Sequence, residues 1–422
     1  MTENIAQNLA EMEVDDDLLV DDDNEVLVED EFDGELAPAD DDDDDDVSDE
    51  EDEIRDLSAL KLTAHTDSVY AVALGQSLDG RLLALTGGGD DLGRLTHVGN
   101  SCIELTGHGD SVSSVAFSHD GALCATGGYD GVVQIWETTG SLTKRIEGPG
   151  DVEWLRFHPR GDVILAGSGD GTVWLWQART GECLRVFVGH EGAVSCGEFT
   201  SDGNGIVTGS ADATVRSWAP KKGTCKHTFA NLPGAIIQLA VKSITEPDII
   251  AAALDAPKAL LFHLKSKQII TNLDLPIAQD DTRIATFVAL APAISWAVVG
   301  DDAGALTLFD YSHGDPATIR HVWTFQDSPI VQAIWHPSQP RLTVATADGF
   351  IRHLDARVGG DPLYELSGHT DLLLALDVHW GPHDYAQSEV HTVLSAGDDR
   401  IPRIFRARFD QSTQHWVVLS SL

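Results

Sequence analysis

One phrase recurs along the chain, and its period is the feature that most restricts the fold. The phrase consists of Gly-His, a short apolar segment, a turn, and a second segment that ends in small residues. An Asp and an apolar run ending in an aromatic residue then complete it. From Asp130 to Asp399, the turn aspartates follow one another at intervals of 40, 42, 43, 47, 46 and 51 residues. A period of this length indicates an array of equivalent units that bury their apolar faces against one another.

Eight copies of the phrase are recognisable. In three of them the step from the turn aspartate to a tryptophan is six residues: Asp130 to Trp136, Asp170 to Trp176 and Asp212 to Trp218. A first copy is marked by His65, Thr86 and either Asp90 or Asp91. Weaker copies follow, with turn aspartates expected at Asp255, Asp302, Asp348 and Asp399; the first two have a seven-residue step.

The segments between the turns are predicted to be strands. They alternate apolar with small residues, they are separated by Gly, Asp and Asn, and no long stretch has a helical period. Together with the Gly-His and Trp landmarks, this pattern resembles the WD-repeat family. The resemblance implies an all-β, eight-bladed WD-repeat β-propeller.

In WD repeats the His, Ser or Thr, Asp and Trp of one repeat form a hydrogen-bond chain inside a blade. The resemblance therefore implies structural networks at His108–Thr126–Asp130–Trp136, at His190–Thr208–Asp212–Trp218, and at His369–Ser395–Asp399 with Phe405 in the last place. Such a chain satisfies buried polar groups. We do not expect these residues to be catalytic, since an enzyme rarely needs three copies of one Asp-His pair.

Charge divides the chain into two parts. Residues 1–56 hold 28 Asp and Glu but one basic residue, Arg55, and residues 57–422 carry a net formal charge of −15. Residues 1–56 are predicted to be a disordered acidic tail, because such a composition buries too little apolar surface to fold. The propeller is expected to occupy residues 57–422. An acidic tail favours basic partners and repels nucleic acid.

Two segments compete for the strand that closes the ring. Each repeat begins with the outer strand of the preceding blade, so residues 58–65 are able to supply the outer strand of the last blade. Residues 414–419, QHWVVL, are a second candidate. Either choice removes an exposed sheet edge.

Other features argue against several classes of protein. There is no long apolar run, no secretory pattern and no catalytic signature, so we expect a protein that is not an enzyme, has no cofactor and does not contact a membrane. The remaining histidines and cysteines suggest no metal site. The expected location is the cytoplasm, with the nucleus as the alternative. The five cysteines are predicted to be small core residues of a reduced, intracellular protein: Cys102, Cys124, Cys183, Cys196 and Cys225.

Acidic residues gather in the loops expected on one face of the ring. The candidate partner-binding residues are Asp67, Asp110, Tyr129, Asp151, Glu153, Trp154, Asp301, Asp327, Asp371 and Asp398. Alternatively, each aspartate that follows a Gly-His position caps its local turn. Together the acids create a negative potential that attracts a basic peptide, whose arginines pair with carboxylates and stack on aromatic rings. We expect a monomer that binds such a peptide and no nucleic acid directly.

The third repeat departs from the others. In the segment 146–159, IEGPGDVEWLRFHP, Pro149 replaces the landmark His, and Ala166 stands where the complete repeats have Thr. Losing both residues removes the hydrogen-bond chain as a unit and leaves no half-satisfied group. Glu153 and Trp154 are expected at the start of the inner strand. Either Glu153 pairs with Arg156 or a neighbouring blade while Trp154 packs, or both residues contact an arginine of a partner.

This odd third repeat, with the acidic tail and the eight repeats, resembles the family of angio-associated migratory cell protein and its fungal relatives. The fungal members are dedicated chaperones of one very basic large-subunit ribosomal protein (universal protein sixteen, called protein ten in yeast). The resemblance implies that the chain binds the N-terminal segment of this newly made protein. A WD-repeat scaffold in signalling or cell migration, including one that reads phosphopeptides through a basic pocket, is an alternative. An acidic histone-binding propeller is another.

Overall fold

The computed structural model describes residues 55–242, 246–276, 282–325, 328–381, 390–410, 412–413 and 415–421. The chain divides into two units, Met1–Asp52 and Glu53–Leu422. All the described residues belong to the second unit, which consists of eight antiparallel sheets. The prediction of an all-β, eight-bladed propeller is confirmed.

Each of the first four blades is a meander of four strands, numbered from the ring axis outwards. Blade 1 contains β2 (Val69–Gln76), β3 (Leu82–Gly88), β4 (Gly93–His97) and β5 (Cys102–Leu105). Blade 2 contains β6 (Val112–Phe117), β7 (Leu123–Gly128), β8 (Val132–Glu137) and β9 (Leu142–Glu147). Blade 3 contains β10 (Val152–Phe157), β11 (Val163–Ser168), β12 (Val173–Gln177) and β13 (Cys183–Phe187). Blade 4 contains β14 (Cys196–Phe199), β15 (Ile206–Gly209), β16 (Val215–Ala219) and β17 (Thr224–Phe229).

The next three blades repeat this order, and the last one is completed by both ends of the unit. Blade 5 contains β18 (Ile236–Val241), β19 (Ile249–Leu254), β20 (Lys258–His263) and β21 (Gln268–Asp274). Blade 6 contains β22 (Ala285–Leu290), β23 (Trp296–Asp301), β24 (Ala305–Asp310) and β25 (Thr318–Thr324). Blade 7 contains β26 (Ile330–Trp335), β27 (Arg341–Thr346), β28 (Ile351–Asp355) and β29 (Tyr364–Leu366). Blade 8 contains β30 (Leu373–Trp380), β31 (Val390–Gly397), β32 (Arg403–Asp410), β1 (Leu60–Lys61) and β33 (His415–Leu419).

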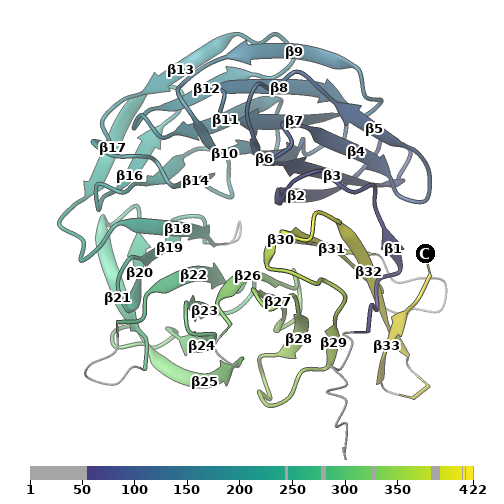
Figure 1. Cartoon of the computed structure of the whole chain (residues 1–422). Coiled ribbons are helices and arrows are strands. Elements are labelled where there is room, and N and C mark those ends of the chain that lie inside the picture. The colour runs from purple at the N-terminus through teal and green to yellow at the C-terminus, as the bar shows by residue number, and fades with distance from the viewer. Residues whose placement is uncertain are drawn as a thin grey trace, which may run out of the picture. The chain divides into compact units, whose positions relative to one another are not determined.

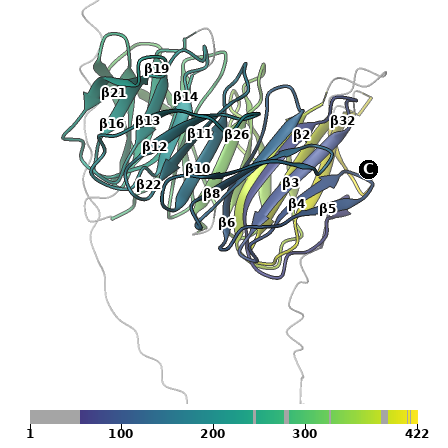
Figure 2. The ribbon, with the colours of Figure 1, turned by 90° about the horizontal axis from the view of Figure 1, so that it is seen from above.

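The first strands of successive blades contact one another around the ring, and β30 contacts β2 to close it (Figure 1). Seen from the side, the strands run between two faces of the ring (Figure 2). We call the upper face the one formed by the loops that enter each first strand and the loops that join second to third strands. The lower face carries the other loops. In the described part of the chain, no helix has the length and apolarity needed to cross a membrane.

Both candidate segments take part in closing the ring. Strand β1 pairs with β32 through Leu60↔Ile404 and Lys61↔Arg403, whereas β33 pairs with the following stretch of β32, from Arg406 to Asp410. The purple β1 and the yellow β33 therefore lie along the same strand (Figure 1). The two segments do not compete, because each covers a different part of the β32 edge. Asp56, assigned to the tail from the sequence, forms an ion pair with Lys61 at 2.7 Å.

The core lies between blades. All six residues of β7 and five of six in β19 are buried, because both faces of a blade pack against neighbouring blades. Outer strands such as β9 are mostly exposed. One apolar cluster joins Val207, Val215 and Phe229 of blade 4 to Ile236 and Leu239 of blade 5.

The cysteines are all free, but they do not share one environment. Cys124 is buried and burial raises the pKa of its thiol to about 12, as expected for a core residue. Cys183 and Cys225 are exposed. The prediction that all five are core residues is therefore wrong for these two, which lie on the outer strands β13 and β17.

A bulge at the start of the first strand shapes the upper face. In blade 3, Val152 pairs with Ser168 and Trp154 with Gly167, so Glu153 is left outside the regular register. The same shift occurs in six other blades. The residues at this bulge position are Tyr70, Ser113, Glu153, Ile237, Thr286, Val331 and Leu374. Ser195 is the corresponding residue of blade 4 by sequence.

Candidate functional site

Blade 4 contains a full internal network. The His190 ring lies 3.0 Å from Asp212 through Nδ1 and 2.7 Å from Thr208 Oγ1 through Nε2, and Trp218 Nε1 donates to Thr208 at 2.9 Å. Because indole only donates, Thr208 accepts from Trp218 and donates to His190, and His190 Nδ1–H donates to Asp212. Burial lowers the pKa of His190, so the ring is neutral. Burial alone would raise the pKa of Asp212, but hydrogen bonds from Thr214, Glu191 and His190 lower it to about 2.

Three other blades have related networks. In blade 2, His108 lies 3.1 Å from Asp130 and 2.8 Å from Thr126, and Trp136 Nε1 is 3.4 Å from the same hydroxyl. In blade 8, His369 lies 2.9 Å from Asp399 and 2.7 Å from Ser395, with the Phe405 ring nearby. Blade 1 shows which aspartate is the landmark, because His65 contacts Asp90 at 2.8 Å as well as Thr86 at 2.7 Å.

Blade 3 is held differently. Asp170 accepts from the Thr172 hydroxyl at 2.6 Å and from its amide at 2.8 Å, and Trp174 Nε1 donates to the same hydroxyl at 2.8 Å. The polar groups of this turn are thus satisfied without Pro149 or Ala166. Trp174 and Trp176 stack, with ring centroids 5.7 Å apart.

Trp154 is a packing residue and not a surface contact. Its side chain is 5% exposed, and its Nε1–H donates to the Val194 carbonyl of blade 4 at 2.8 Å. The indole lies over Gly167 and Gly197, where a Cβ atom would come within 2.3 Å and 2.1 Å of the ring. The prediction that Trp154 contacts a partner is therefore corrected. Its ring is packed between blades 3 and 4, and its single hydrogen-bond donor is bonded to blade 4.

The Trp154 bond replaces one that other blades make with a hydroxyl. At the bulge position, Ser113 donates to Val152 of the next blade, Ser195 donates to Ile236, and Thr286 donates to Ile330. In each case the acceptor is the carbonyl of the first residue of the next inner strand. In blade 3, the indole of Trp154 reaches the equivalent carbonyl. The side chain at position 153 therefore does not need to donate a hydrogen bond to the next blade, and a carboxylate is tolerated there.

Glu153 is a half-buried carboxylate without a cationic partner among the described residues. The expected pairing with Arg156 is absent from the structure, since Arg156 Nε bonds Glu198 of blade 4 at 2.5 Å. Burial, followed by the charge of Asp151, raises the pKa of Glu153. A cation supplied by a partner would stabilise the ionised form of such an unpaired, partly desolvated carboxyl group.

Tyr129 lies within electrostatic range of this carboxylate and of a second tyrosine, Tyr70. Tyr70 and Tyr129 are 42% and 40% exposed. Burial raises the pKa of Tyr129, and the charges of Glu153, Asp151 and Asp110 act in the same direction, which places these acids within electrostatic range of its hydroxyl. We call the following set, drawn from blades 1 to 3, the acidic–aromatic cluster: Asp67, Tyr70, Asp110, Tyr129, Asp151 and Glu153.

Small residues make room for the larger members of this cluster. In blade 3, a Cβ at Gly169 would lie 3.2 Å from Glu153 Oε1. In blade 1, a Cβ at Gly89 would lie 3.2 Å from the Asp67 carboxyl and 3.3 Å from the Tyr70 ring. Blade 2 reverses the arrangement, with the small Ser113 at the bulge and Tyr129 in the place of the glycine. In blades 1 to 3, the large side chain therefore alternates between the bulge position and the loop that joins the second to the third strand.

The aspartates after the Gly-His positions do cap their turns, as the simpler alternative held. Asp67, Asp110 and Asp371 each accept a hydrogen bond from the next residue's amide, at 2.8, 2.7 and 2.8 Å. Each remains exposed, as does Asp151. Capping uses one carboxylate oxygen, so the charge still contributes to the upper face. With the partly exposed Asp398, acids form an arc over blades 8, 1, 2 and 3.

Asp301 of blade 6 does not contribute to this arc as predicted. Asp301 is 1% exposed, and its carboxylate accepts from the Ala303 and Ala305 amides at 3.2 and 2.6 Å and from Arg283 at 3.3 Å. The prediction of Asp301 as a partner contact is corrected, because this last residue of β23 is buried and its carboxylate is already bonded. Asp327 lies outside the described residues.

The seven-residue steps have a structural cause. The Asp255 and Asp302 amides donate to Ala235 and Ile284, as the Tyr129 amide donates to Ser111. Both aspartates therefore occupy the position before the landmark, and Ala256 and Ala303 occupy the landmark itself. Asp255 and Asp302 are exposed on the upper face, and the extra residue in their spacing was the signal for it. Tyr70 was also missed, although it aligns with Glu153 directly after the first valine of its strand.

Another carboxylate, that of Asp377, lies on a first strand near the ring axis. Asp377 of β30 accepts from the Leu74 amide of blade 1 at 2.7 Å and from the Val378 amide at 2.8 Å, joining the last blade to the first. Burial raises the pKa of Asp377 to about 6. Its charge also interacts with Arg156 of blade 3.

One group of side chains has metal-ligand chemistry. Ligand atoms of His119, Asp120 and Asp162 lie within 4.8 Å of one another. Arg179, however, bonds Asp162 at 2.5 Å and Asp120 at 3.5 Å. Both carboxylates thus already have a cationic partner, which explains the grouping without an ion.

The fold and the repeat networks define a WD-repeat β-propeller. The family model for the WD domain, G-beta repeat, matches residues 99–137, 140–177 and 181–219, the third repeat included. The chain contains WD repeats, and it retains the family's hydrogen-bond network in complete form in blades 2 and 4.

Among WD-repeat proteins, the chain is homologous to angio-associated migratory cell protein. It is 27% identical to the Homo sapiens protein over 365 residues, which cover 83% of this chain and 80% of that protein. It is 30% identical to the ribosome assembly protein SQT1 of Saccharomyces cerevisiae over 171 residues, 36% of this chain and 39% of that protein.

Solved structures show the same fold. The crystal structure of Saccharomyces cerevisiae Sqt1 matches with a TM-score of 0.74 and 22% identity, covering 83% of this chain and 99% of that chain. Chaetomium thermophilum Sqt1 bound to the N-terminus of the ribosomal protein L10 matches with a TM-score of 0.71 and 20% identity, with the same coverage.

Proposed function

We propose that this protein is a ribosome-assembly chaperone that binds the basic N-terminal segment of a newly made large-subunit ribosomal protein. The observation that carries the proposal is the acidic–aromatic cluster, in which the unpaired Glu153 lies near the half-exposed Tyr129, and Tyr129 near Tyr70. The relative Sqt1, which has been crystallised with the N-terminus of ribosomal protein L10, supports the same assignment for the client.

The cluster has the chemistry that an arginine side chain requires. A guanidinium is planar and weakly hydrated, so it pairs with a carboxylate while it stacks on an aromatic face. Glu153 and Asp110 would supply the carboxylates, and Tyr70 and Tyr129 the rings. Further arginines of an extended segment would follow the arc towards Asp371 and Asp398 of blade 8.

An acidic surface also explains how a chaperone keeps such a client soluble. A free, strongly cationic protein binds nucleic acid through its charges without sequence preference. The propeller carries a net formal charge of −15 over residues 57–422, and residues 1–56 carry 28 acids. Binding of the client's basic N-terminal segment to the upper face would mask the charge of that segment and prevent its contact with RNA until assembly.

The proposal is tested with a synthetic peptide of the N-terminal segment of ribosomal protein L10, measured by isothermal titration calorimetry at several salt concentrations. We expect Glu153→Arg to weaken binding at least about tenfold, because a like charge replaces the attractive one. Glu182→Lys is the matched control, since Glu182 is an exposed acid on a lower-face loop of the same blade. Equal effects of both substitutions, or no binding by the unsubstituted protein, would overturn the proposal.

A second peptide separates this function from that of a histone-binding propeller. The two functions share their charge logic, but a lysine ammonium neither stacks as well as a guanidinium nor pairs bidentately with Glu153. We expect replacement of the peptide's arginines by lysines to reduce affinity, and a lysine-rich histone tail peptide to bind less tightly than the L10 segment. Preference for the histone peptide would favour the alternative.

A further inference from the structure

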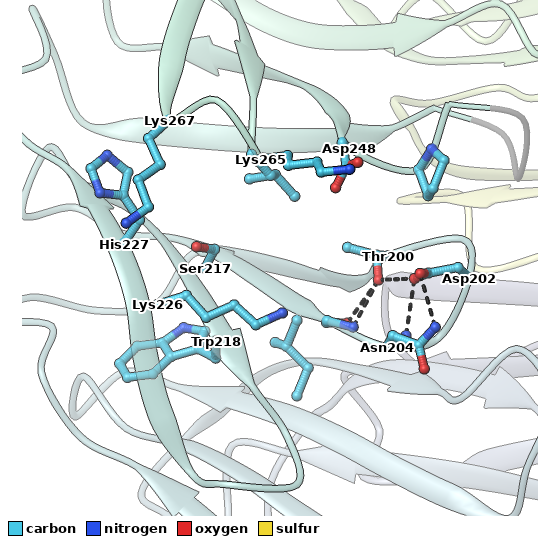
Figure 3. Close-up of a pocket in the computed structure, with 14 residues that line it drawn as sticks. Thr200, Asp202, Asn204, Ser217, Trp218, Lys226, His227, Asp248, Lys265 and Lys267 are labelled. Atoms are coloured by element: carbon cyan, nitrogen blue, oxygen red, sulfur yellow. Dashed lines mark hydrogen bonds between the residues drawn. The ribbon is translucent and has the colours of Figure 1, made fainter.

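The lower face contains a pocket whose charge is opposite to that of the acidic arc. A cavity of about 450 Å³ lies between blades 4 and 5. Its walls come from the loops that join first to second and third to fourth strands, and from the strands β16 and β17. Thr200, Ser217, Lys226 and Asp248 are among the lining residues (Figure 3). These loops lie on the side of the ring away from Glu153 and Tyr129, so the two sites do not overlap.

Three lysines line this pocket, and their charges are not used by the fold. Lys226 comes from β17, whereas Lys265 and Lys267 come from the turn before β21. All three are exposed, and among the described residues none of them forms an ion pair with a carboxylate. By contrast, Lys61 pairs with Asp56, Lys242 with Glu246 and Lys258 with Asp274.

The concentration of lysine here is unusual for so acidic a chain. Lys221 and Lys222 belong to the turn that leads into β17, and seven of the nine lysines in the sequence fall between residues 221 and 267. Lys221 and Lys222 follow β16 on the lower face, where third strands are joined to fourth strands. The fold brings that pair to the same face as the second group of lysines, from the neighbouring blade.

The carboxylates of the pocket do not cancel this charge. Asp202 is engaged by its own turn, where it accepts from Thr200 at 2.6 Å and from the Asn204 amide at 3.0 Å (Figure 3). Burial opposes ionisation of Asp202, but these hydrogen bonds lower its pKa and keep it charged. Asp248 is the second acid in the lining. Three pocket lysines with Lys221 and Lys222 at the turn leave a net positive charge.

The remaining lining favours a protein segment over a bare anion or a nucleic acid. Ile206 and Leu264 give the pocket an apolar part next to the ammonium groups. A protein segment with an apolar side chain between acidic ones matches both features. A long polyanion such as RNA is repelled by a chain with a formal charge of −42, whereas a short segment brings much less charge.

We propose that the lysine pocket of Lys226, Lys265 and Lys267 is a docking site for an acidic segment of a partner protein. Its anionic groups are carboxylates or phosphoserines, since an ammonium pairs with either. The site is independent of the function proposed for the upper face. Because the two sites lie on opposite faces, the protein is able to hold a basic client and an acidic partner at the same time.

The test uses the full chain and fluorescence anisotropy at low salt with three labelled probes of equal length. The first is a peptide of Asp and Glu residues around a leucine, the second its phosphoserine counterpart, and the third a single-stranded RNA. We expect saturable binding of at least one peptide, and at least about a tenfold loss of affinity in Lys226→Glu/Lys267→Glu. Preference between the two peptides identifies the anionic group.

Lys144→Glu, at an exposed lysine of blade 2, is the control and is expected to leave peptide binding unchanged. Thermal unfolding checks that the variants fold, and binding of the L10 segment to the upper face is expected to persist in all of them. Absence of saturable binding by both peptides, or binding that the double substitution does not reduce, overturns the proposal. Tighter binding of the RNA, lost in the same variant, overturns it as well and assigns the pocket to nucleic acid.

Discussion

Blades 3 and 4 are neighbours with the same four-strand layout, yet different interactions stabilise them. Blade 4 has an internal chain from Trp218 through Thr208 and His190 to Asp212. Blade 3 lacks that chain and instead bonds to its neighbour through Trp154. The difference teaches that a repeat tolerates the loss of its internal network when another donor takes over the contact between blades. It also shows how a position on the upper face becomes available for function.

The largest effect is expected from removing the contact that blade 3 relies on. Trp154→Ala should lower the free energy of unfolding by about 4 kcal/mol, because it empties a large buried site between two blades. Urea denaturation followed by tryptophan fluorescence measures this loss. Trp154→Phe is the control: it keeps most of the packing and gives up one hydrogen bond, so a loss of about 1 kcal/mol is expected beyond the reduced volume. A Trp154→Ala variant as stable as the parent would contradict the assignment of this ring to the interface.

Blade 4 should be sensitive at its histidine. His190→Ala leaves Thr208 and Asp212 without their shared partner, and we expect a loss of about 2 to 3 kcal/mol in the free energy of unfolding. A double-mutant cycle with Thr208→Val measures the coupling, which should be large since both residues belong to one chain. The converse change in blade 3, Pro149→His, should bring no gain, because Ala166 offers no hydroxyl. A stabilising Pro149→His would break the comparison.

A third prediction concerns Asp377, whose carboxylate interacts electrostatically with Arg156 of blade 3. Its pKa is raised from 3.8 to about 6 in the folded protein by burial, so between these pH values the folded state binds more protons than the unfolded state. Stability is therefore expected to fall as pH rises through this window, with a penalty of up to about 3 kcal/mol above it. Asp377→Asn should remove that penalty at the expense of one backbone hydrogen bond, for a net gain of about 2 kcal/mol at neutral pH.

Thermal unfolding across the pH range checks this prediction. The gain from Asp377→Asn should be present above pH 6 and disappear as pH falls towards 4, where the parent carboxyl is itself protonated. Asp371→Asn is a suitable control, since Asp371 is an exposed carboxylate in the same blade. A gain that is independent of pH would show that charge is not its cause.

The smallest expected effect separates function from stability at the bulge. Glu153→Gln should change the free energy of unfolding by less than about 0.5 kcal/mol, while affinity for the L10 segment falls about tenfold. Burial and Asp151 raise the pKa of Glu153, so the parent should lose affinity on acidification at a higher pH than an ordinary glutamate would. The substituted protein should lack that step. Calorimetry at a series of pH values measures this step in the parent and in Glu153→Gln. A step of equal size in the two proteins would show that another group titrates.

Much of this molecule could be predicted from the sequence. The period, the turn chemistry and the Gly-His and Trp landmarks are local features, and they led to eight blades and to the networks around His108, His190 and His369. Position within a repeat also identified the acids that face the upper loops. Burial was harder to predict, because it depends on what covers a side chain: Trp154 lies against Val194 and Gly197 of blade 4, and Asp301 is 1% exposed.

The sequence by itself determined the fold class and the charge of the molecule, because strand period, turn residues and composition act within one repeat. Only the tertiary structure decided which of these residues are free to bind. It showed that β1 and β33 share one edge, that Arg156 pairs with Glu198 instead of Glu153, and that lysines distant in sequence meet at one pocket. The physical reason is that these outcomes depend on contacts between blades, and such contacts join residues of different repeats, as Trp154 and Val194 do across 40 positions.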